Sequence, residues 1–319
     1  MKKSLLRFTM IIPLVFLLCF TFSCKQGEEP TIEETEEEDT SGTVNIDGFE
    51  LPYFIEGTGI PCVVTCDALP QSRALSQGLR KHFKFVFLEP RVGIRYDKPV
   101  KYDNITMDTI VEDIDKVRRA LGIDEIAVLG HSACGLFAIE YARKYPEHTS
   151  HVIMIGTPPY WNAGAIEVGK EYWESNASDE RKMILKRNRD KLNKEALSGL
   201  SSSEVQIMRY IANGPLYWYD PTYDCLWLIE GYYWNVEGWN HFLNIIMAEY
   251  DITRGNQITT PVFLALGRHD YVVPYVLWDD QTEKLSNLSY NLFEKSGHYP
   301  MLEEQELFDK KLIDWIKSH

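Results

Sequence analysis

The stretch Gly130-His131-Ser132-Ala133-Cys134-Gly135 decides the fold. The apolar run 126–129 before it is typical of a buried strand, and residues 136–144 after it have apolar side chains at helical spacing. The sequence therefore predicts that a strand ends, the chain turns sharply at Ser132 and a helix begins. This is the arrangement of a G-x-S-x-G nucleophile elbow, in which the serine stands at the carboxyl edge of a sheet beside a helix N-terminus.

The second glycine position of this pattern holds Cys134, whose small side chain is compatible with the turn. A structural turn with an N-capping serine would give the same local pattern, so the motif alone leaves both interpretations open. Two later motifs favour the catalytic one. Asp270 ends Gly267-Arg268-His269-Asp270 after a predicted strand, and His298 lies in Ser296-Gly297-His298-Tyr299-Pro300 after the last predicted strand.

The chain order Ser132, Asp270, His298, with each residue in a strand-to-helix loop, is that of a hydrolytic triad. A serine hydroxyl is a weak nucleophile that needs a base, which His298 supplies. The imidazole in turn needs a carboxylate on its other nitrogen, and Asp270 fits that role.

The motifs LGHSACG, LGRHDYVVP and SGHYPMLEE resemble those of the α/β-hydrolase superfamily, over roughly residues 44–319. Within it, the chain is similar to the cap-bearing group that includes proline iminopeptidases and esterase- or lactonase-like enzymes. The resemblance implies a mostly parallel, doubly wound α/β sheet with a helical cap insertion, and catalysis by Ser132, Asp270 and His298 through an acyl-enzyme.

The oxyanion region departs from that family. The first donor is expected to be the backbone N–H of Ala133. Where the family usually has His-Gly, this chain has Cys66-Asp67, which makes Ala68 the second donor when counted from the strand and Leu69 when counted back from the next proline. A carboxylate at Asp67 would oppose a developing oxyanion unless it points away.

A second family motif, Asp-x-Arg-Gly, appears here as Glu89-Pro90-Arg91-Val92-Gly93. Because both diagnostic motifs of proline iminopeptidases are altered, the sequence argues against that specific activity. Glu204 and Glu230, in the predicted cap, are candidates for binding a substrate amine, although each also fits a solvated helix position.

Strands and helices are expected to alternate along the rest of the chain, with an antiparallel start, and this alternation predicts an α/β fold. The predicted strands are a hairpin at 44–55 and then 61–65, 83–88, 126–129, 151–155, 261–266 and 288–293. The predicted helices are 71–81, 107–121, 136–144, 276–285 and 302–316.

Between residues 157 and 259 the alternation stops, and the stretch holds six of the eight Trp and nine of the eighteen Tyr residues. Because it lies between two core strands, we expect it to cover the carboxyl edge of the sheet, where α/β folds bind ligands. The sequence thus predicts core segments at 43–156 and 260–319 and a cap at 157–259 that roofs an apolar pocket.

The N-terminus has the pattern of a targeting segment: basic residues, an apolar run and then Cys24. It resembles a bacterial lipoprotein signal, which implies a signal peptide at 1–23, a lipid anchor on Cys24 and an exported, membrane-anchored protein. An ordinary cleaved signal peptide would read similarly. Residues 24–42 are expected to form a flexible acidic tether, since 28–39 contain eight acidic residues and no basic one.

Composition limits the partners. A net charge of −14 argues against a nucleic-acid ligand, and 45% hydrophobic residues indicate a globular protein. No cofactor or metal is implied, because no Cys/His cluster has metal-binding spacing. Cys62 and Cys66 are too far apart on a strand to pair, and the four cysteines at 62, 66, 134 and 225 are expected to be buried small hydrophobes.

The predicted function is therefore hydrolysis of a small, largely apolar ester, thioester, lactone or amide. Alternatives on the same fold are a proline iminopeptidase-like aminopeptidase, a carbon–carbon bond hydrolase and a haloperoxidase-like enzyme. A catalytically weak, surface-tethered binding protein is the alternative of a different class.

Overall fold

The computed structural model describes residues 40–248 and 250–319. The predicted signal peptide, Cys24 and all but the last residues of the predicted tether lie outside the described residues. Within the described ranges, none of the helices has both the length and the apolar character needed to cross a bilayer.

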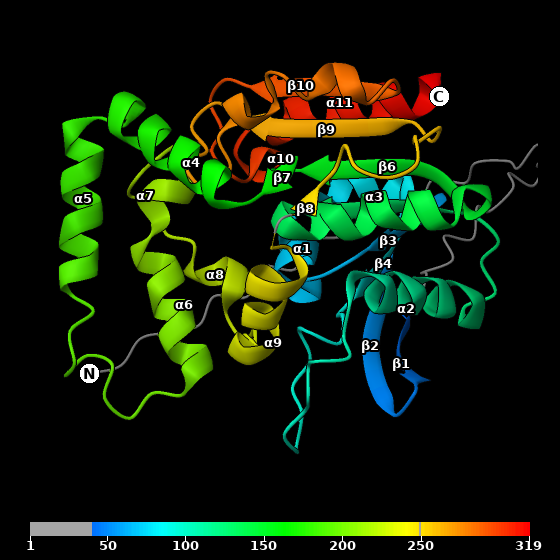
Figure 1. The fold of residues 1–319 in the computed structure, drawn as a ribbon, viewed down its shortest axis with the longest axis horizontal. Helices are drawn as coiled ribbons and strands as arrows, with labels where there is room; N and C mark the ends of the chain where they lie inside the picture. Colours follow the sequence, from blue (N-terminus) through cyan, green and yellow to red (C-terminus); the bar gives the residue numbers. More distant parts are fainter. Residues whose placement is uncertain (1–39, 249) are drawn as a thin grey trace, which may run out of the picture. The chain divides into compact units, whose positions relative to one another are not determined.

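An eight-stranded sheet forms the centre of the structure, with the strand order β1-β2-β4-β3-β5-β6-β9-β10 (Figure 1). β2 pairs antiparallel with β1 and β4, and all other neighbours are parallel, so the predicted mostly parallel sheet with an antiparallel start is confirmed. The strands are β1 (Thr40–Ile46), β2 (Phe49–Glu56), β3 (Ile60–Val64), β4 (Phe83–Leu88), β5 (Ile126–His131), β6 (Thr149–Ile155), β9 (Val262–Gly267) and β10 (Leu288–Phe293).

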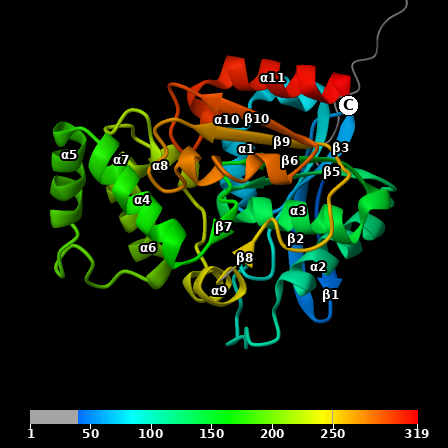
Figure 2. The ribbon, with the colours of Figure 1, turned by 45° about the horizontal axis from the view of Figure 1, so that its top comes forward.

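Helices cover both faces of this sheet (Figure 2). Alternate strand residues enter two separate apolar cores, because successive side chains of a strand point to opposite faces. Val63 and Val128 pack on the side of α2 and α3, whereas Val64 and Leu129 pack on the side of α1 and α11. These four helices are α1 (Ala68–Ala74), α2 (Met107–Ala120), α3 (Gly135–Lys144) and α11 (Gln305–Ser318).

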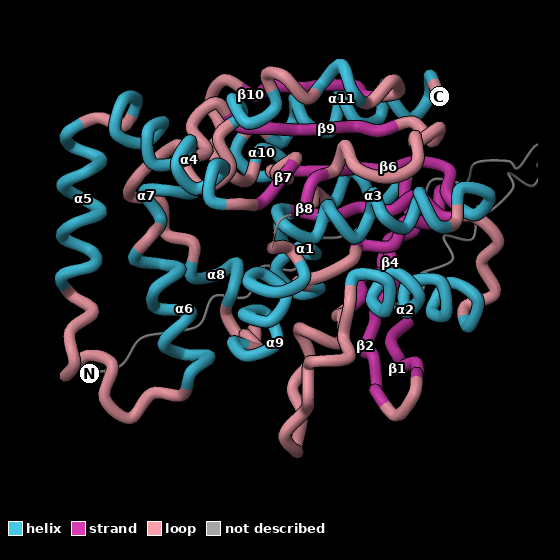
Figure 3. The backbone as a smooth tube through the Cα atoms, viewed as in Figure 1, coloured by secondary structure: helices cyan, strands magenta, loops and turns pink. Residues whose placement is uncertain are grey.

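The region between β6 and β9 is mostly helical (Figure 3). A short antiparallel pair, β7 (Tyr160–Trp161) and β8 (Tyr250–Asp251), lies near its two ends. Its helices are α4 (Ala163–Asn176), α5 (Asp179–Asp190), α6 (Ser202–Ala212), α7 (Gly214–Tyr217), α8 (Leu226–Ile229) and α9 (Val236–His241), followed by a π-helical turn at Phe242–Ile246.

The predicted helix at 71–81 is wrong in its bounds. α1 begins three residues earlier, at Ala68, and ends at Ala74, and a separate 3₁₀ turn covers Gln77–Lys81. Leu75 is extended between them, and the Ser76 hydroxyl accepts the Leu79 N–H, which caps the second turn. A capping serine inside an apolar periodic stretch thus starts a new turn rather than continuing the helix.

The predicted helix at 276–285 is replaced by two 3₁₀ turns, Tyr275–Trp278 and Thr282–Lys284. Trp278 is fully buried, and its indole N–H donates to the Thr157 carbonyl at 2.8 Å. This tertiary contact outweighs the local helical preference of the segment. The terminal helix also begins earlier than predicted, as α10 (Pro300–Glu303), and is interrupted at Glu304 before α11.

Candidate active site

Ser132 lies at the sharp turn between β5 and α3. Its backbone is left-handed, with a φ of 55°, which is uncommon for a residue other than glycine. A short 3₁₀ turn, Ser132–Cys134, leads directly into α3. Backbone strain of this kind persists only where the surrounding structure holds it, and it is concentrated at functional sites.

Close packing around Gly130 holds this turn. A Cβ at that position would lie 2.2 Å from the carbonyl oxygen of Cys134, so a larger residue would push strand and helix apart. The glycine at the first position of the motif is therefore required by the close approach of β5 to the start of α3.

Asp270 is fully buried and holds the ring of His298. One carboxylate oxygen accepts the Nδ1–H of His298 at 2.6 Å. The other accepts the backbone N–H groups of Val272 and Val273 at 2.9 and 2.8 Å. These bonds fix the carboxylate and leave Nε2 of His298 as the ring nitrogen that can act on a substrate.

The backbone of His298 is held from two sides. Its N–H donates to the Tyr217 carbonyl at 2.6 Å, and its carbonyl lies 2.8 Å from Nε2 of His131. Because a carbonyl can only accept, Nε2 of His131 carries the proton, and burial lowers the pKa of this imidazole well below its usual value. Nδ1 of the neutral ring then accepts from the Gln71 amide at 3.2 Å. His131 is thus hydrogen-bonded in the interior, and its ring also borders the cavity described next.

A cavity of about 230 Å³ lies above the elbow, and both Ser132 and His298 line it. The structure therefore brings Asp270 and His298 into direct contact and places Ser132 in the wall of the same cavity. The Ala133 residue expected to supply an oxyanion donor also lines it. Residues between β6 and β9 form much of the remaining wall: Pro158, Trp161, Gln206, Tyr210, Tyr217, Trp234, Trp239, Leu243 and Met247.

Glu303 ties the histidine loop to the helical region. Its carboxylate accepts the backbone N–H of Gly297 at 2.7 Å and that of Tyr219 at 2.6 Å. Burial raises the pKa of this carboxyl to about 7, against the lowering effect of the N–H donors. One side chain therefore holds both the residue before His298 and a segment after α7.

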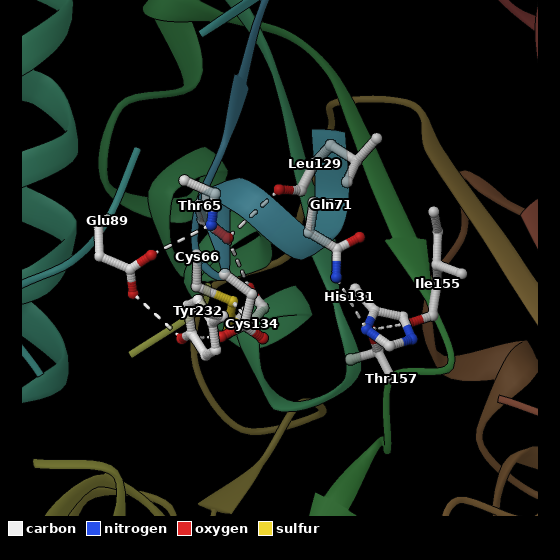
Figure 4. Close-up of a disulfide and its surroundings, with 12 residues drawn as sticks. Thr65, Cys66, Gln71, Glu89, Leu129, His131, Cys134, Ile155, Thr157 and Tyr232 are labelled. Atoms are coloured by element: carbon white, nitrogen blue, oxygen red, sulfur yellow. Dashed lines mark hydrogen bonds between the residues drawn. A yellow bond between two sulfur atoms is a disulfide. The ribbon is translucent and has the colours of Figure 1, made fainter. Parts of the chain in front are cut away.

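A disulfide joins Cys66 and Cys134, with their Cα atoms 6.3 Å apart (Figure 4). The expectation that all four cysteines are unpaired small hydrophobes is therefore wrong for this pair, while Cys62 and Cys225 are buried and free as expected. Cys66 follows β3 and Cys134 follows β5, which are neighbouring parallel strands, so their carboxyl ends meet. The residue in the second glycine position of the elbow is thus covalently linked to the segment that replaces His-Gly.

Asp67 and Glu89 lie beside this disulfide and share Tyr232. The Tyr232 hydroxyl lies 3.5 Å from Glu89 (Figure 4). It donates to Asp67 at 2.6 Å, and Glu89 accepts the backbone N–H of Ala68 at 3.1 Å. Burial raises the pKa of Asp67 to about 6, and burial together with Asp67 raises the pKa of Glu89. Asp67 also lines the cavity, where it is the one carboxylate among the described lining residues.

This arrangement bears on the expected second oxyanion donor. The Ala68 N–H is engaged by the Glu89 carboxylate, and Ala68 is not among the residues that line the cavity with Ser132. The expected alternative, Leu69, is likewise outside that lining. Of the substrate-amine candidates, Glu204 caps α6 through Ser201, which matches the interpretation as a solvated helix residue, and Glu230 is exposed and outside the lining.

Sequence reasoning missed the disulfide, the Asp67–Glu89 pair and Glu303. A signal for the disulfide was present, because Cys66 and Cys134 each stand in a family motif whose loops meet at the same sheet edge. The carboxyl pair also had a signal, since both acids occupy altered motif positions. The potential metal ligands Cys66, Asp67 and Cys134 lie within 4.8 Å of one another, but the two sulfurs are bonded to each other.

A family model described as the alpha/beta hydrolase fold matches residues 63–305. The chain belongs to the α/β-hydrolase family. The relatives of this chain include named hydrolases and proline iminopeptidases, which indicates that it is an enzyme.

The α/β hydrolase is 29% identical over 278 residues to the AB hydrolase superfamily protein YclE of Bacillus subtilis (strain 168), covering 86% of this chain and 98% of that protein. It is 24% identical to a proline iminopeptidase of Heyndrickxia coagulans, over 88% of this chain and 99% of the relative. Among solved structures, an alpha/beta fold family hydrolase from Bacillus anthracis str. Sterne superposes with a TM-score of 0.64 at 19% identity, over 86% and 99% of the two chains. This last likeness concerns the fold alone.

The Asp67–Glu89 pair gives the α/β hydrolase a testable pH dependence. Raised folded-state pKa values mean that the folded protein retains protons that the unfolded chain releases above about pH 4. The contribution of Asp67 is full below that pH and is lost as pH rises through about 6, and that of Glu89 is lost as pH rises through its own raised pKa. Glu89→Gln removes the like charge, so we expect the variant to gain on the order of 1 kcal/mol in unfolding free energy relative to wild type between pH 5 and pH 8.

Urea unfolding followed by tryptophan fluorescence at both pH values measures this difference. Glu125→Gln, at an exposed position, is the matched control and should show the same pH trend as wild type. If the unfolding free energy of Glu89→Gln changed with pH as that of wild type does, the raised pKa of Glu89 would be contradicted.

Proposed function

We propose that the protein is a serine hydrolase in which Ser132, His298 and Asp270 act as nucleophile, base and orienting acid. The observation that carries the proposal is the combination of a left-handed Ser132 and an Asp270-bound His298 on one cavity. Three separate strand-to-helix loops contribute these groups, and the fold brings those loops to the same edge of the sheet.

In the proposed reaction, the Ser132 hydroxyl attacks the carbonyl carbon of the substrate while Nε2 of His298 takes its proton. Asp270 stabilises the resulting imidazolium through the Nδ1–H bond. His298 then returns the proton to the leaving group as the bond from the acyl carbon to that group breaks. A water, deprotonated by His298, attacks the acyl carbon, and the bond to Ser132 breaks as His298 returns the proton to the serine oxygen. The two backbone N–H bonds to Asp270 keep this carboxylate oriented throughout.

The oxyanion donors are proposed to be the backbone N–H groups of Ala133 and Asp67. Both residues line the cavity, whereas the N–H of Ala68 donates to Glu89. Ala133 lies in the short turn that starts α3, where the helix dipole adds to its attraction for negative charge. The Asp67 carboxyl accepts from Tyr232, and burial raises its pKa to about 6, so its opposition to an oxyanion weakens as the pH falls through that value.

The proposed substrate is a small ester, thioester, lactone or amide with a largely apolar acyl group. Aromatic and aliphatic side chains dominate the cavity, and its lining has no Lys or Arg among the described residues. Such a wall binds apolar groups by excluding water from them. The helical region at 157–259 is proposed to act as the cap that encloses this group.

A proline iminopeptidase-like aminopeptidase is the second candidate. It is favoured by the relatives of that name and by the carboxyl of Asp67 in the cavity wall, which is able to face a substrate ammonium. The altered motifs at Cys66-Asp67 and Glu89 weigh against it. A parallel assay of p-nitrophenyl butyrate and L-proline p-nitroanilide separates the two, since the aminopeptidase would prefer the anilide.

We also propose that the protein is exported and anchored through Cys24. The disulfide supports export, because such bonds persist in oxidising compartments and are rare in the cytosol of most organisms. The basic, apolar and cysteine-ending start of the chain is the second support.

Ser132→Ala is expected to abolish covalent labelling by a fluorophosphonate probe and to lower kcat for p-nitrophenyl butyrate by about 10⁴-fold or more, because the nucleophile is lost. Ser202→Ala, at an exposed serine, should label and turn over like wild type. Equal labelling of wild type and Ser132→Ala would refute the proposed nucleophile.

Leu243→Ala should shift the preference among p-nitrophenyl esters toward longer acyl chains, because Leu243 lines the cavity and its truncation makes room. The ratio of kcat/KM for octanoate to that for butyrate is expected to rise roughly tenfold, the effect of one or two buried methylene groups. Ile245→Ala, in the same π-helical turn but 64% exposed, is the matched control. An unchanged ratio in Leu243→Ala would place the acyl group elsewhere.

Cys24→Ser should abolish incorporation of an alkyne-tagged fatty acid during expression in a bacterium and move the protein from the membrane fraction to the soluble fraction. Cys19→Ser, a cysteine within the apolar run, should keep both properties. Label retained by Cys24→Ser would show that this cysteine is not the anchor.

A further inference from the structure

The disulfide occupies an unusual place relative to the reaction centre. Cys66 immediately precedes Asp67, and Cys134 follows Ser132 by two residues. These are the two segments that would supply the backbone N–H groups for a developing oxyanion. The bond therefore joins the two halves of the oxyanion site, 68 residues apart in the sequence.

The regular sheet does not extend to these segments. The pairing of β3 with β5 ends at Val64 and Leu129, before either segment begins. Beyond it, Thr65 continues the connection: its N–H donates to the Leu129 carbonyl at 2.9 Å, and its hydroxyl lies 3.2 Å from that carbonyl and 3.1 Å from that of Cys134. The next residue is Cys66, so the disulfide adds a covalent link directly after the residue that makes these hydrogen bonds (Figure 4).

Other contacts hold residues 67 and 68 to different parts of the molecule. Asp67 accepts from Tyr232, a residue of the helical region, and Ala68 donates to Glu89, which follows β4. Both contacts connect this segment to neighbours other than the elbow. Asp67 also has a left-handed backbone, with a φ of 50°, so its N–H direction depends on a conformation that non-glycine residues rarely adopt without constraint.

We propose that Cys66 and Cys134 are positioning residues for the oxyanion site, and that their disulfide sets the orientation of the Asp67 N–H relative to Ser132 and the Ala133 N–H. The proposal rests on the proposed hydrolase function. A misplacement of about 1 Å in such a site costs about 10²-fold in rate, and loss of one donor costs about 10²–10³-fold. Breaking the bond therefore lowers kcat while leaving the apolar cavity that binds the acyl group largely intact.

The test compares the Cys66→Ser/Cys134→Ser double variant with a Cys62→Ser/Cys225→Ser control, which removes the two buried free cysteines and keeps the disulfide. Three quantities are measured on each: kcat and KM for p-nitrophenyl butyrate, the rate constant for fluorophosphonate labelling, and inhibition by a trifluoromethyl ketone, whose tetrahedral adduct places an oxyanion in the site. Circular dichroism and thermal melting check that the variants are folded at the assay temperature.

The expected result for the disulfide variant is a fall of about 10–100-fold in kcat and in labelling rate, a matching loss of trifluoromethyl ketone affinity, and a KM within about threefold of wild type. The control should match wild type in all of these. Mild reduction of the wild-type protein by a phosphine should reproduce the variant, and reoxidation should restore activity. EDTA is included, because the freed thiols and Asp67 would be close enough to capture a metal ion.

If the double variant does not fold, reduction of the wild-type protein tests the positioning role of the disulfide instead. Unchanged kcat in a folded, reduced protein would overturn the proposal, as would a loss of activity that follows the melting temperature with no selective loss of ketone affinity. Absence of labelling and turnover in the oxidised wild type would instead refute the hydrolase function, and the positioning role would fall with it.

Discussion

The left-handed turn at Ser132 is the constraint on which the rest of the site depends. It reverses the chain between a buried strand and a buried helix within a few residues, which is possible only because Gly130 allows the two backbones to touch. The turn exposes one side chain at the carboxyl edge of the sheet. Asp67, Asp270 and His298 reach that edge from the ends of other strands, so the topology of the parallel sheet brings the candidate groups together.

Buried acids around the cavity have two different environments. Asp270 is fully buried, and its two carboxylate oxygens accept three hydrogen bonds, so its polar atoms are satisfied in the interior. Asp67 and Glu89 face each other across a single tyrosine hydroxyl, and both have raised pKa values. The first carboxylate is therefore held in place by donors and orients an imidazole, whereas burial raises the pKa of the other two acids, with Asp67 adding to the effect on Glu89.

Much of the core was predictable because strong apolar runs and helical periodicity bounded by glycine or proline are local signals, as at 107–121 and 126–129. The prediction of a helix at 276–285 is wrong because the tertiary contact of the buried Trp278 outweighs the local helical preference. Ser132, Asp270 and His298 could be proposed as a triad from their motifs, from their order along the chain and from their positions after predicted strands. Local signals could not predict the Cys66–Cys134 disulfide or the hydrogen bond from Ala68 to Glu89. Both depend on which loops meet in space rather than on neighbouring residues in the sequence.

Glu303 links the helical region to the loop that carries His298. The same carboxylate accepts the N–H groups of Gly297, next to His298, and of Tyr219 in the helical region, and the His298 N–H donates to the Tyr217 carbonyl. Moving Tyr217 and Tyr219 away from the sheet would break two of these hydrogen bonds, the one from Tyr219 to Glu303 and the one from His298 to Tyr217. The position of the His298 loop is therefore coupled to that of the segment containing Tyr217 and Tyr219.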